Sequence, residues 1–244
     1  MGRKWQNIKL DKGKTDAQRG ALFTRLSREI TLAAKSGSPD PESNHRLRLA
    51  VDKARENNMP SDNVKRAIAR ASGAGEKEIE EIRYEGYGPH GLAVVIDAAT
   101  DNRNRTAGEL RFTFTKHGGA LGETGSVGWM FDAVGVIEVD PRGASEDALT
   151  ESALVDGVVD LDYSEVRAYI YTEPAQLAAA RDALRDTLKM ADVYLGVRAK
   201  QTVALEGSEL VAALAFLDVL EEHEDVQHVF SNLDVSEAAL EALT

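Results

Sequence analysis

The chain has 244 residues, 43% hydrophobic and 29% charged, an ordinary composition for one large or two to three small globular domains. It has no cysteine, which excludes disulfides and thiolate metal sites and fits a reducing compartment. The basic first 14 residues are not followed by an apolar signal-peptide core, and no stretch is long and apolar enough to cross a bilayer. A cytoplasmic location is therefore expected.

The net charge of -12 conceals a strong asymmetry along the chain. Residues 1–75 contain 16 Lys or Arg against 8 Asp or Glu, a net of +8. The remaining residues contain 13 basic against 33 acidic side chains, a net of -20. This split predicts two functional surfaces in one chain, of which the basic one suits a polyanion.

The first 14 residues show no hydrophobic periodicity, which indicates an extended or disordered arm. A basic arm that carries an aromatic residue can contact phosphates and stack on a base. The alternative for the aromatic residue is packing against the first helix. The candidate nucleic-acid contacts in the arm are Arg3, Lys4, Trp5, Lys9, Lys12 and Lys14.

Three amphipathic helices follow the arm. The first is expected at about 16–35, the second ends at Asn57, and the third begins at Ser61. Each has apolar residues at helical spacing on one face and basic residues on the other, which predicts a small bundle with a basic exterior. The excess of basic charge favours a nucleic-acid footprint over a solvated surface of mixed sign. The candidate contacts on these helices are Arg25, Arg28, Lys35, Arg46, Arg48, Lys53, Lys65, Arg66 and Arg70.

A Gly- and Pro-rich stretch, 84–91, comes next and is expected to be neither helix nor central strand. A buried strand is predicted at 92–96 and a polar loop at 100–105. Thr106 and Glu109 stand at capping-box spacing, which places the start of a helix at about Ala107. Gly118-Gly119 ends that helix, and a glycine loop at 122–128 leads to a second apolar segment.

Two features of residues 84–131 allow alternative interpretations. The glycines of 118–128 could cradle a phosphate, but no P-loop or dinucleotide-binding string is present, so tight turns are the better interpretation. Arg103 and Arg105 stand beside a helix N-terminus, where two guanidiniums can hold an anion such as a phosphate. The alternative is a structural clasp in which Asp101 and Glu109 neutralise both arginines. Spacing alone does not decide between the two.

Three strings carry a resemblance to a known family, and they read Tyr84-Glu85-Gly86-Tyr87-Gly88-Pro89, Thr100-Asp101-Asn102-Arg103-Asn104-Arg105-Thr106 and Gly125-Ser126-Val127. The chain resembles the YebC/PmpR family over nearly its whole length. That family includes bacterial regulators and a mitochondrial translational activator of a cytochrome oxidase subunit. The family pattern near the N-terminus has His-Ser where this chain has Gly2-Arg3, so no role of that histidine can be transferred.

Further along, strands are expected at 135–139, 166–171 and 193–197, and helices at 145–158 and from about Pro174 to Leu188. An extended segment at 202–206, a helix at 208–222 and a strand at 226–230 complete the chain. Because 82–131 supplies too few strands to fold alone, the tail is expected to complete its sheet. The prediction is an α+β, multidomain protein, consistent with the family's three domains: a helical bundle (1–78), a discontinuous ferredoxin-like domain (79–133 plus 200–244) and an inserted ferredoxin-like domain (134–199).

No catalytic residue, metal or cofactor is predicted, because the five histidines lack metal-ligand spacing and no acid/base pair is evident from sequence. The resemblance implies a nucleic-acid-binding regulator of gene expression, most simply a DNA-binding transcriptional regulator. The alternative, suggested by the mitochondrial relatives, is a translation factor that binds RNA and the ribosome. Neither hypothesis involves a membrane, and the chain shows no obvious dimer seam, so a monomer is expected.

Overall fold

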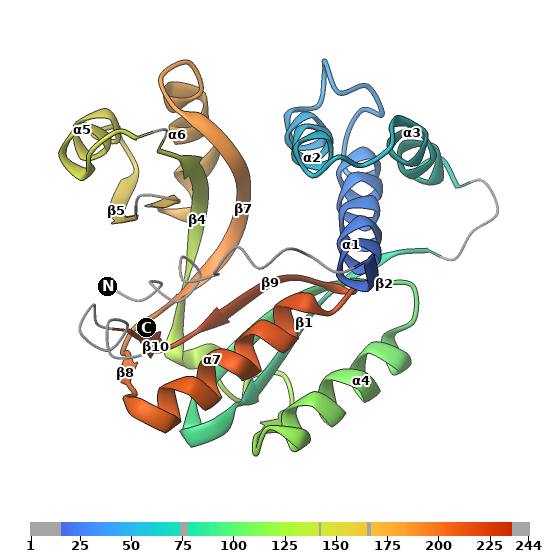
Figure 1. Cartoon of the computed structure of the whole chain (residues 1–244). Coiled ribbons are helices and arrows are strands. Elements are labelled where there is room, and N and C mark those ends of the chain that lie inside the picture. The colour runs from blue at the N-terminus through green and yellow to red at the C-terminus, as the bar shows by residue number, and fades with distance from the viewer. Residues whose placement is uncertain (1–15, 74–77, 142, 165–166, 236–244) are drawn as a thin grey trace. The chain divides into compact units, whose positions relative to one another are not determined.

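The computed structural model describes residues 16–73, 78–141, 143–164 and 167–235. Contacts divide the chain into two compact units. Of the described residues, the first unit contains those of 130–207 and 232–235, and the second contains those of 16–129 and 208–231. The chain leaves the second unit after Trp129 and returns to it at Ser208, so the fold is α+β and multidomain, with one unit interrupting the other (Figure 1).

The second unit begins with the three predicted helices, α1 (Asp16–Lys35), α2 (His45–Glu56) and α3 (Ser61–Arg70). The Asn44 side chain accepts a hydrogen bond from Leu47 N and caps α2, and Asn57 is its C-cap. α1 packs against both other helices. The shared core is made of the residues that the helical spacing placed inward, among them Leu26, Ile30, Leu47, Ala50, Val51, Ala54, Val64 and Ala67.

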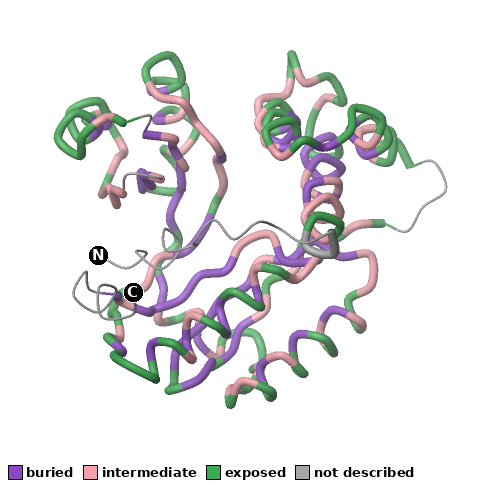
Figure 2. The backbone as a smooth tube through the Cα atoms, in the orientation of Figure 1, coloured by how far each residue is buried: buried purple, intermediate pink, exposed green. Residues whose placement is uncertain are grey.

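The sheet of the second unit has the strand order β3-β1-β2-β9. Its strands are β1 (Glu80–Tyr87), β2 (Ala93–Thr100), β3 (Ala120–Leu121) and β9 (Val226–Ser231), and all neighbours are antiparallel. β2 is buried along almost its whole length (Figure 2). Helices α4 (Arg103–Lys116) and α7 (Gly207–Glu222) lie along the sheet (Figure 1), and the rings of Phe114 and Phe216 meet edge to face between them at 4.9 Å.

This sheet differs from the predicted one in two strands. Residues 84–87 belong to β1, which lies between β3 and β2, although their glycines argued against a central strand. The glycine is required there by packing, because a Cβ on Gly86 would come within 2.6 Å of the Phe114 ring. The segment 202–206 is not part of this sheet: β8 (Val203–Ala204) pairs with β10 (Leu233–Asp234) in a separate parallel ladder. The tail nevertheless supplies β9, which pairs with β2.

The first unit contains a second sheet with the order β5-β6-β4-β7. Its elements follow one another as strand, helix, strand, strand, helix, strand, the ferredoxin-like arrangement. The core on one face includes Ile137, Leu149, Ile170 and Leu184. The bounds are β4 (Phe131–Asp140), α5 (Glu146–Ser152), β5 (Val158–Tyr163), β6 (Ala168–Thr172), α6 (Leu177–Leu184) and β7 (Lys189–Ala199).

Two helices of this unit are shorter than predicted. α5 ends at Ser152, and the chain then passes Gly157, at φ 86, into β5, a strand that the sequence analysis missed. α6 ends at Leu184 because residues from Lys189 onward are needed for β7, which pairs with β4 along ten positions. Short 3-10 turns stand at Pro89–Gly91, Gly128–Met130 and Pro174–Gln176.

Candidate nucleic-acid interface

The basic residues predicted to contact nucleic acid divide by exposure. Those of the arm (Arg3, Lys4, Trp5, Lys9, Lys12 and Lys14) lie outside the described residues. On the helices, Arg25 and Lys53 are half-buried. The exposed ones are Lys35, Arg46, Arg48, Lys65, Arg66 and Arg70. Residues 16–73 hold 11 Lys or Arg against 7 Asp or Glu, so the bundle is basic without the arm.

Several of the exposed basic side chains have carboxylate partners. Arg46 reaches Glu81 at 2.7 Å and Arg48 reaches Glu42 at 3.5 Å. Further exposed pairs join Lys35 to Glu78 and Lys65 to Asp62, and the half-buried Lys53 pairs with Glu29. Exposed ion pairs contribute only about 0–1 kcal/mol each. A phosphate can therefore replace these carboxylates at little cost, and the pairs do not prevent the surface from binding a polyanion.

Arg28 does not lie on the outer face where the helical spacing placed it. Its side chain is 9% exposed and forms an ion pair with Asp225, whose side chain is not exposed at all. Arg28 also donates to the main-chain oxygen of Glu224 at 2.7 Å. The prediction that Arg28 projects outward is wrong, because α1 also packs against β2 and β9. The neighbouring Arg25 likewise donates to the main-chain oxygen of Glu221, at 2.7 Å.

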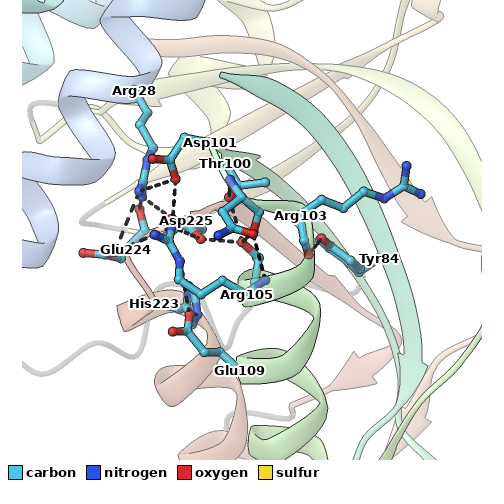
Figure 3. A network of polar contacts seen from close by, with 12 residues as sticks. Arg28, Tyr84, Thr100, Asp101, Arg103, Arg105, Glu109, His223, Glu224 and Asp225 are labelled. Atoms are coloured by element: carbon cyan, nitrogen blue, oxygen red, sulfur yellow. Dashed lines mark hydrogen bonds and ion pairs between the residues drawn. The ribbon is translucent and has the colours of Figure 1, made fainter. Parts of the chain in front are cut away.

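Helix α4 begins at Arg103, four residues before the predicted start. The Asn102 side chain accepts from Arg105 N at 3.2 Å and is the N-cap, whereas Thr106 lies inside the helix. Both arginines are thus in the first turn of α4 rather than in a loop. The two side chains diverge, since Arg105 enters the polar network and Arg103 is exposed and points away from it (Figure 3).

Asp225 is the centre of this network (Figure 3). It accepts from Arg105 at 2.9 and 3.1 Å and from the Thr106 hydroxyl at 2.5 Å, and it faces Arg28. Burial acts to raise the pKa of Asp225, but the hydrogen bonds and the two guanidiniums outweigh it and hold that pKa below its ordinary value. Asp101 adds a second carboxylate, 3.1 Å from Arg105. The contacts of Arg105 with carboxylates are therefore those expected for a structural clasp.

One group among the described residues could be considered for a metal. Ligand atoms of Glu109, His223 and Asp225 lie within 4.8 Å of one another. However, His223 Nδ1 accepts the Asp225 main-chain N–H at 3.1 Å, which leaves the ring proton on Nε2, 3.0 Å from Glu109. A ligating imidazole nitrogen must direct a lone pair at the metal. In this arrangement the lone pair of Nδ1 already accepts a hydrogen bond and Nε2 carries the proton. The group is therefore better described as a hydrogen-bonded part of the network.

A second buried carboxylate, Glu85, organises the glycine loop 122–128. It is 6% exposed and accepts main-chain N–H groups from Gly125 at 2.9 Å, Val127 at 2.9 Å and Gly128 at 2.6 Å. Burial acts to raise the pKa of Glu85, but these three donors hold it below its ordinary value. The N–H groups that might have cradled a phosphate are thus used internally, in agreement with the tight-turn interpretation.

Three carboxylates close to the 100–105 segment in sequence or across the sheet, Glu85, Asp97 and Asp101, have structural partners. Glu85 holds the loop, Asp97 forms a double hydrogen bond with Arg83, and Asp101 pairs with Arg105. Sequence reasoning did not identify Asp225 as an important residue, and it gave Thr106 a capping role instead of a contact with Asp225. Their partners come from α1, α4 and the turn after α7, and no spacing rule connects segments at opposite ends of a chain.

The fold and these surfaces define a multidomain α+β protein with a basic helical bundle joined to an acidic remainder. The chain belongs to the TACO1/YebC family: residues 3–74 match the "TACO1/YebC protein N-terminal domain" and residues 79–233 the "TACO1/YebC second and third domain". This confirms the resemblance read from the sequence.

Among relatives, the chain is 48% identical to a "Probable transcriptional regulatory protein" of Symbiobacterium thermophilum, over 98% of this chain and 100% of that one. It is 44% identical to a protein of the same description from Rubrobacter xylanophilus, over 97% and 96% of the two chains. A conserved hypothetical protein of Aquifex aeolicus, known from a crystal structure, matches with a TM-score of 0.86 and 40% identity over 96% of this chain and 98% of that one. None of the helices in the described part of the chain has the length and apolar character needed to span a membrane.

Proposed function

We propose that this chain is a non-enzymatic, nucleic-acid-binding regulator of gene expression, and specifically a DNA-binding transcriptional regulator. The observation that carries the proposal is the exposed set of basic side chains on α2 and α3, in a chain whose first 14 residues are also basic. The descriptions of the relatives as transcriptional regulators agree with it. Phosphate contacts made by such a surface supply affinity without sequence readout.

The proposed surface combines the arm residues with basic side chains of the bundle. It comprises Lys35, Arg46, Arg48, Lys65, Arg66, Arg70 and the half-buried Lys53 together with the arm residues. It omits Arg28, which is buried, and Arg25, which donates to the main-chain oxygen of Glu221. α3 is the densest part, with Lys65, Arg66 and Arg70 exposed within ten residues. Arg103 stays a separate candidate, because it is exposed at the N-terminus of α4.

The test is a salt titration of binding by the full chain. Affinity for duplex DNA and for RNA is measured at several salt concentrations, and log affinity should fall linearly with log salt. The double variant Lys65→Gln with Arg66→Gln should bind more weakly and reduce the slope by up to about 0.9 per lost phosphate contact. The matched control, Arg185→Gln with Lys200→Gln, removes the same charge from exposed positions of the inserted unit. Equal losses from both variants, or no binding at low salt, would refute the proposal.

A second candidate, a ribosome-associated translation factor, is favoured by one observation. Residues 76–244 carry a net charge of -20, which a basic ribosomal protein attracts. The two candidates give different results when the protein is crosslinked in cells and the bound nucleic acid is sequenced. Recovery of genomic DNA supports the transcriptional regulator, and recovery of ribosomal RNA supports the translation factor.

A further inference from the structure

Two aromatic side chains stand exposed beside the loop that Glu85 holds. Trp129 is 67% exposed and Tyr87 is 39% exposed. Trp129 Nε1 and the Tyr87 hydroxyl both donate to the main-chain oxygen of Ser126, each at 3.2 Å. The two side chains therefore flank a single carbonyl group. Large aromatic surfaces left in water at adjacent positions are unfavourable in an isolated protein, which indicates a binding role.

The support beneath this pair is rigid. The Glu85 carboxylate accepts three main-chain N–H groups of the loop, from Gly125, Val127 and Gly128, and Val127 is fully buried. A Cβ on Gly128 would come within 3.0 Å of that carboxylate, and Gly125 has φ +91. The loop thus has the residues that its tight path requires, and it fixes the carbonyl to which both aromatic side chains are bonded. Rings held in this way can bind without a further loss of side-chain entropy.

The hydrogen bonds limit what this pair can recognise. Aromatic grooves that bind proline-rich peptides commonly use the Tyr hydroxyl or Trp N–H to donate to the peptide carbonyls. Here both donors are already bonded to Ser126, so what the pair offers to a ligand is the exposed surface of the two rings. A planar π system is the ligand that such a surface suits, and every nucleobase has one.

We propose that Tyr87 and Trp129 form a stacking platform for an unpaired nucleobase of single-stranded nucleic acid. This inference rests on the proposed nucleic-acid-binding function and adds a base contact to the phosphate contacts of the bundle. The contact is tolerant of sequence, because stacking does not read the hydrogen-bonding edges of a base. Duplexes, whose bases are already stacked, do not satisfy it.

The chain offers a direct optical test, because it has two tryptophans, Trp5 and Trp129. All measurements are made in a Trp5→Phe background, in which the emission reports on Trp129. A short single-stranded RNA should quench that emission, whereas an abasic oligonucleotide of equal length should bind through its phosphates without quenching. In the same background Trp129→Leu should weaken RNA binding roughly tenfold, a loss typical of one stacked base. Trp129→Tyr should keep most of the affinity, since a tyrosine ring also stacks.

The outcomes separate this inference from the function on which it rests. If the RNA binds with the salt dependence of the bundle but causes no quenching, and Trp129→Leu binds as well as its parent, the platform is refuted and the function stands. If RNA does not bind, the platform is tested by measuring whether adenosine monophosphate at high concentration quenches the Trp129 emission. Ribose phosphate, which has no base, is the control. Quenching by the nucleotide alone supports the platform, and its absence refutes it. Quenching by a proline-rich peptide but not by nucleotides would also refute it.

Discussion

Asp225 is a carboxylate without exposed surface that faces two guanidiniums and accepts a threonine hydroxyl. Replacing one partner of a buried ion pair leaves the other charges uncompensated, which typically costs about 3–5 kcal/mol. We therefore expect Asp225→Ala to lower the free energy of unfolding by an amount of this order, since Arg28 and Arg105 lose their shared partner. Urea denaturation at neutral pH measures it.

The control for this prediction is Glu224→Gln at the adjacent position. The Glu224 side chain is 44% exposed and lies 3.7 Å from Arg28 and 4.0 Å from Arg105, so its loss should change stability by less than about 1 kcal/mol. Similar losses for the two variants would mean that Asp225 is not the centre of the network.

The lowered pKa of Glu85 predicts how the stability of the protein depends on pH. Its pKa in the folded protein lies below the ordinary value of 4.5, so it stabilises the folded state fully above that value. The contribution is lost as the pH falls through the folded pKa, because the unfolded chain binds the proton more readily. Glu85→Gln removes this contribution. The stability difference between the parent and Glu85→Gln should therefore be largest near neutral pH and shrink in acid, as urea denaturation between pH 7 and pH 3 would show. A difference that grows in acid would contradict the assignment.

At the scale of elements, two glycines allow a matched comparison. A Cβ on Gly86 in β1 would meet the Phe114 ring at 2.6 Å and the Ala120 oxygen at 2.7 Å, whereas a Cβ on Gly108 in α4 would meet nothing within 4 Å. Gly86→Ala should destabilise the protein by about 1–3 kcal/mol through overpacking. Gly108→Ala should stabilise it by about 0.5–1 kcal/mol, because alanine favours a helix interior. Thermal melts of the two variants should shift in opposite directions, and a shared direction would contradict the packing described here.

The same elements show how far the sequence could predict the fold. Helices α1–α3 were predicted close to their observed bounds, because their apolar residues recur at helical spacing and their ends carry capping and turn residues. The start of α4 was missed because Asn102 and Thr106 are both good caps, and buried Asp225 engages the Thr106 hydroxyl. β1 was missed because the need for Gly86 arises from a ring on another element. The charge asymmetry was visible in the sequence. The burial of Arg28 was not, because it depends on contact with Asp225, which is almost 200 residues away in sequence.

At the scale of the whole molecule, the chain passes from one unit to the other and returns. Phe131 and Ala199 are partners across the β4–β7 ladder, so the two ends of the inserted segment lie on neighbouring strands. A short Gly/Ser linker can therefore replace residues 134–199 without stretching the chain. We expect this deletion variant to keep a cooperative thermal transition, because it retains β1, β2, α4, β3, α7 and β9.

Truncation after residue 200 should have the opposite effect, although it removes fewer residues. It deletes β9, the neighbour of β2, and it removes Phe216 from the Phe114 ring. It also removes Asp225, which leaves Arg28 and Arg105 without their buried carboxylate. The remaining sheet would have an exposed apolar edge and face, so the truncated chain should lose the cooperative transition of the second unit. Circular dichroism melts of both variants compare the two outcomes. A cooperative melt of the truncated chain would show that the second unit does not need the tail. A non-cooperative melt of the deletion variant would show that the second unit does not fold without residues 134–199. Either result would contradict the prediction that the tail completes the sheet of the second unit.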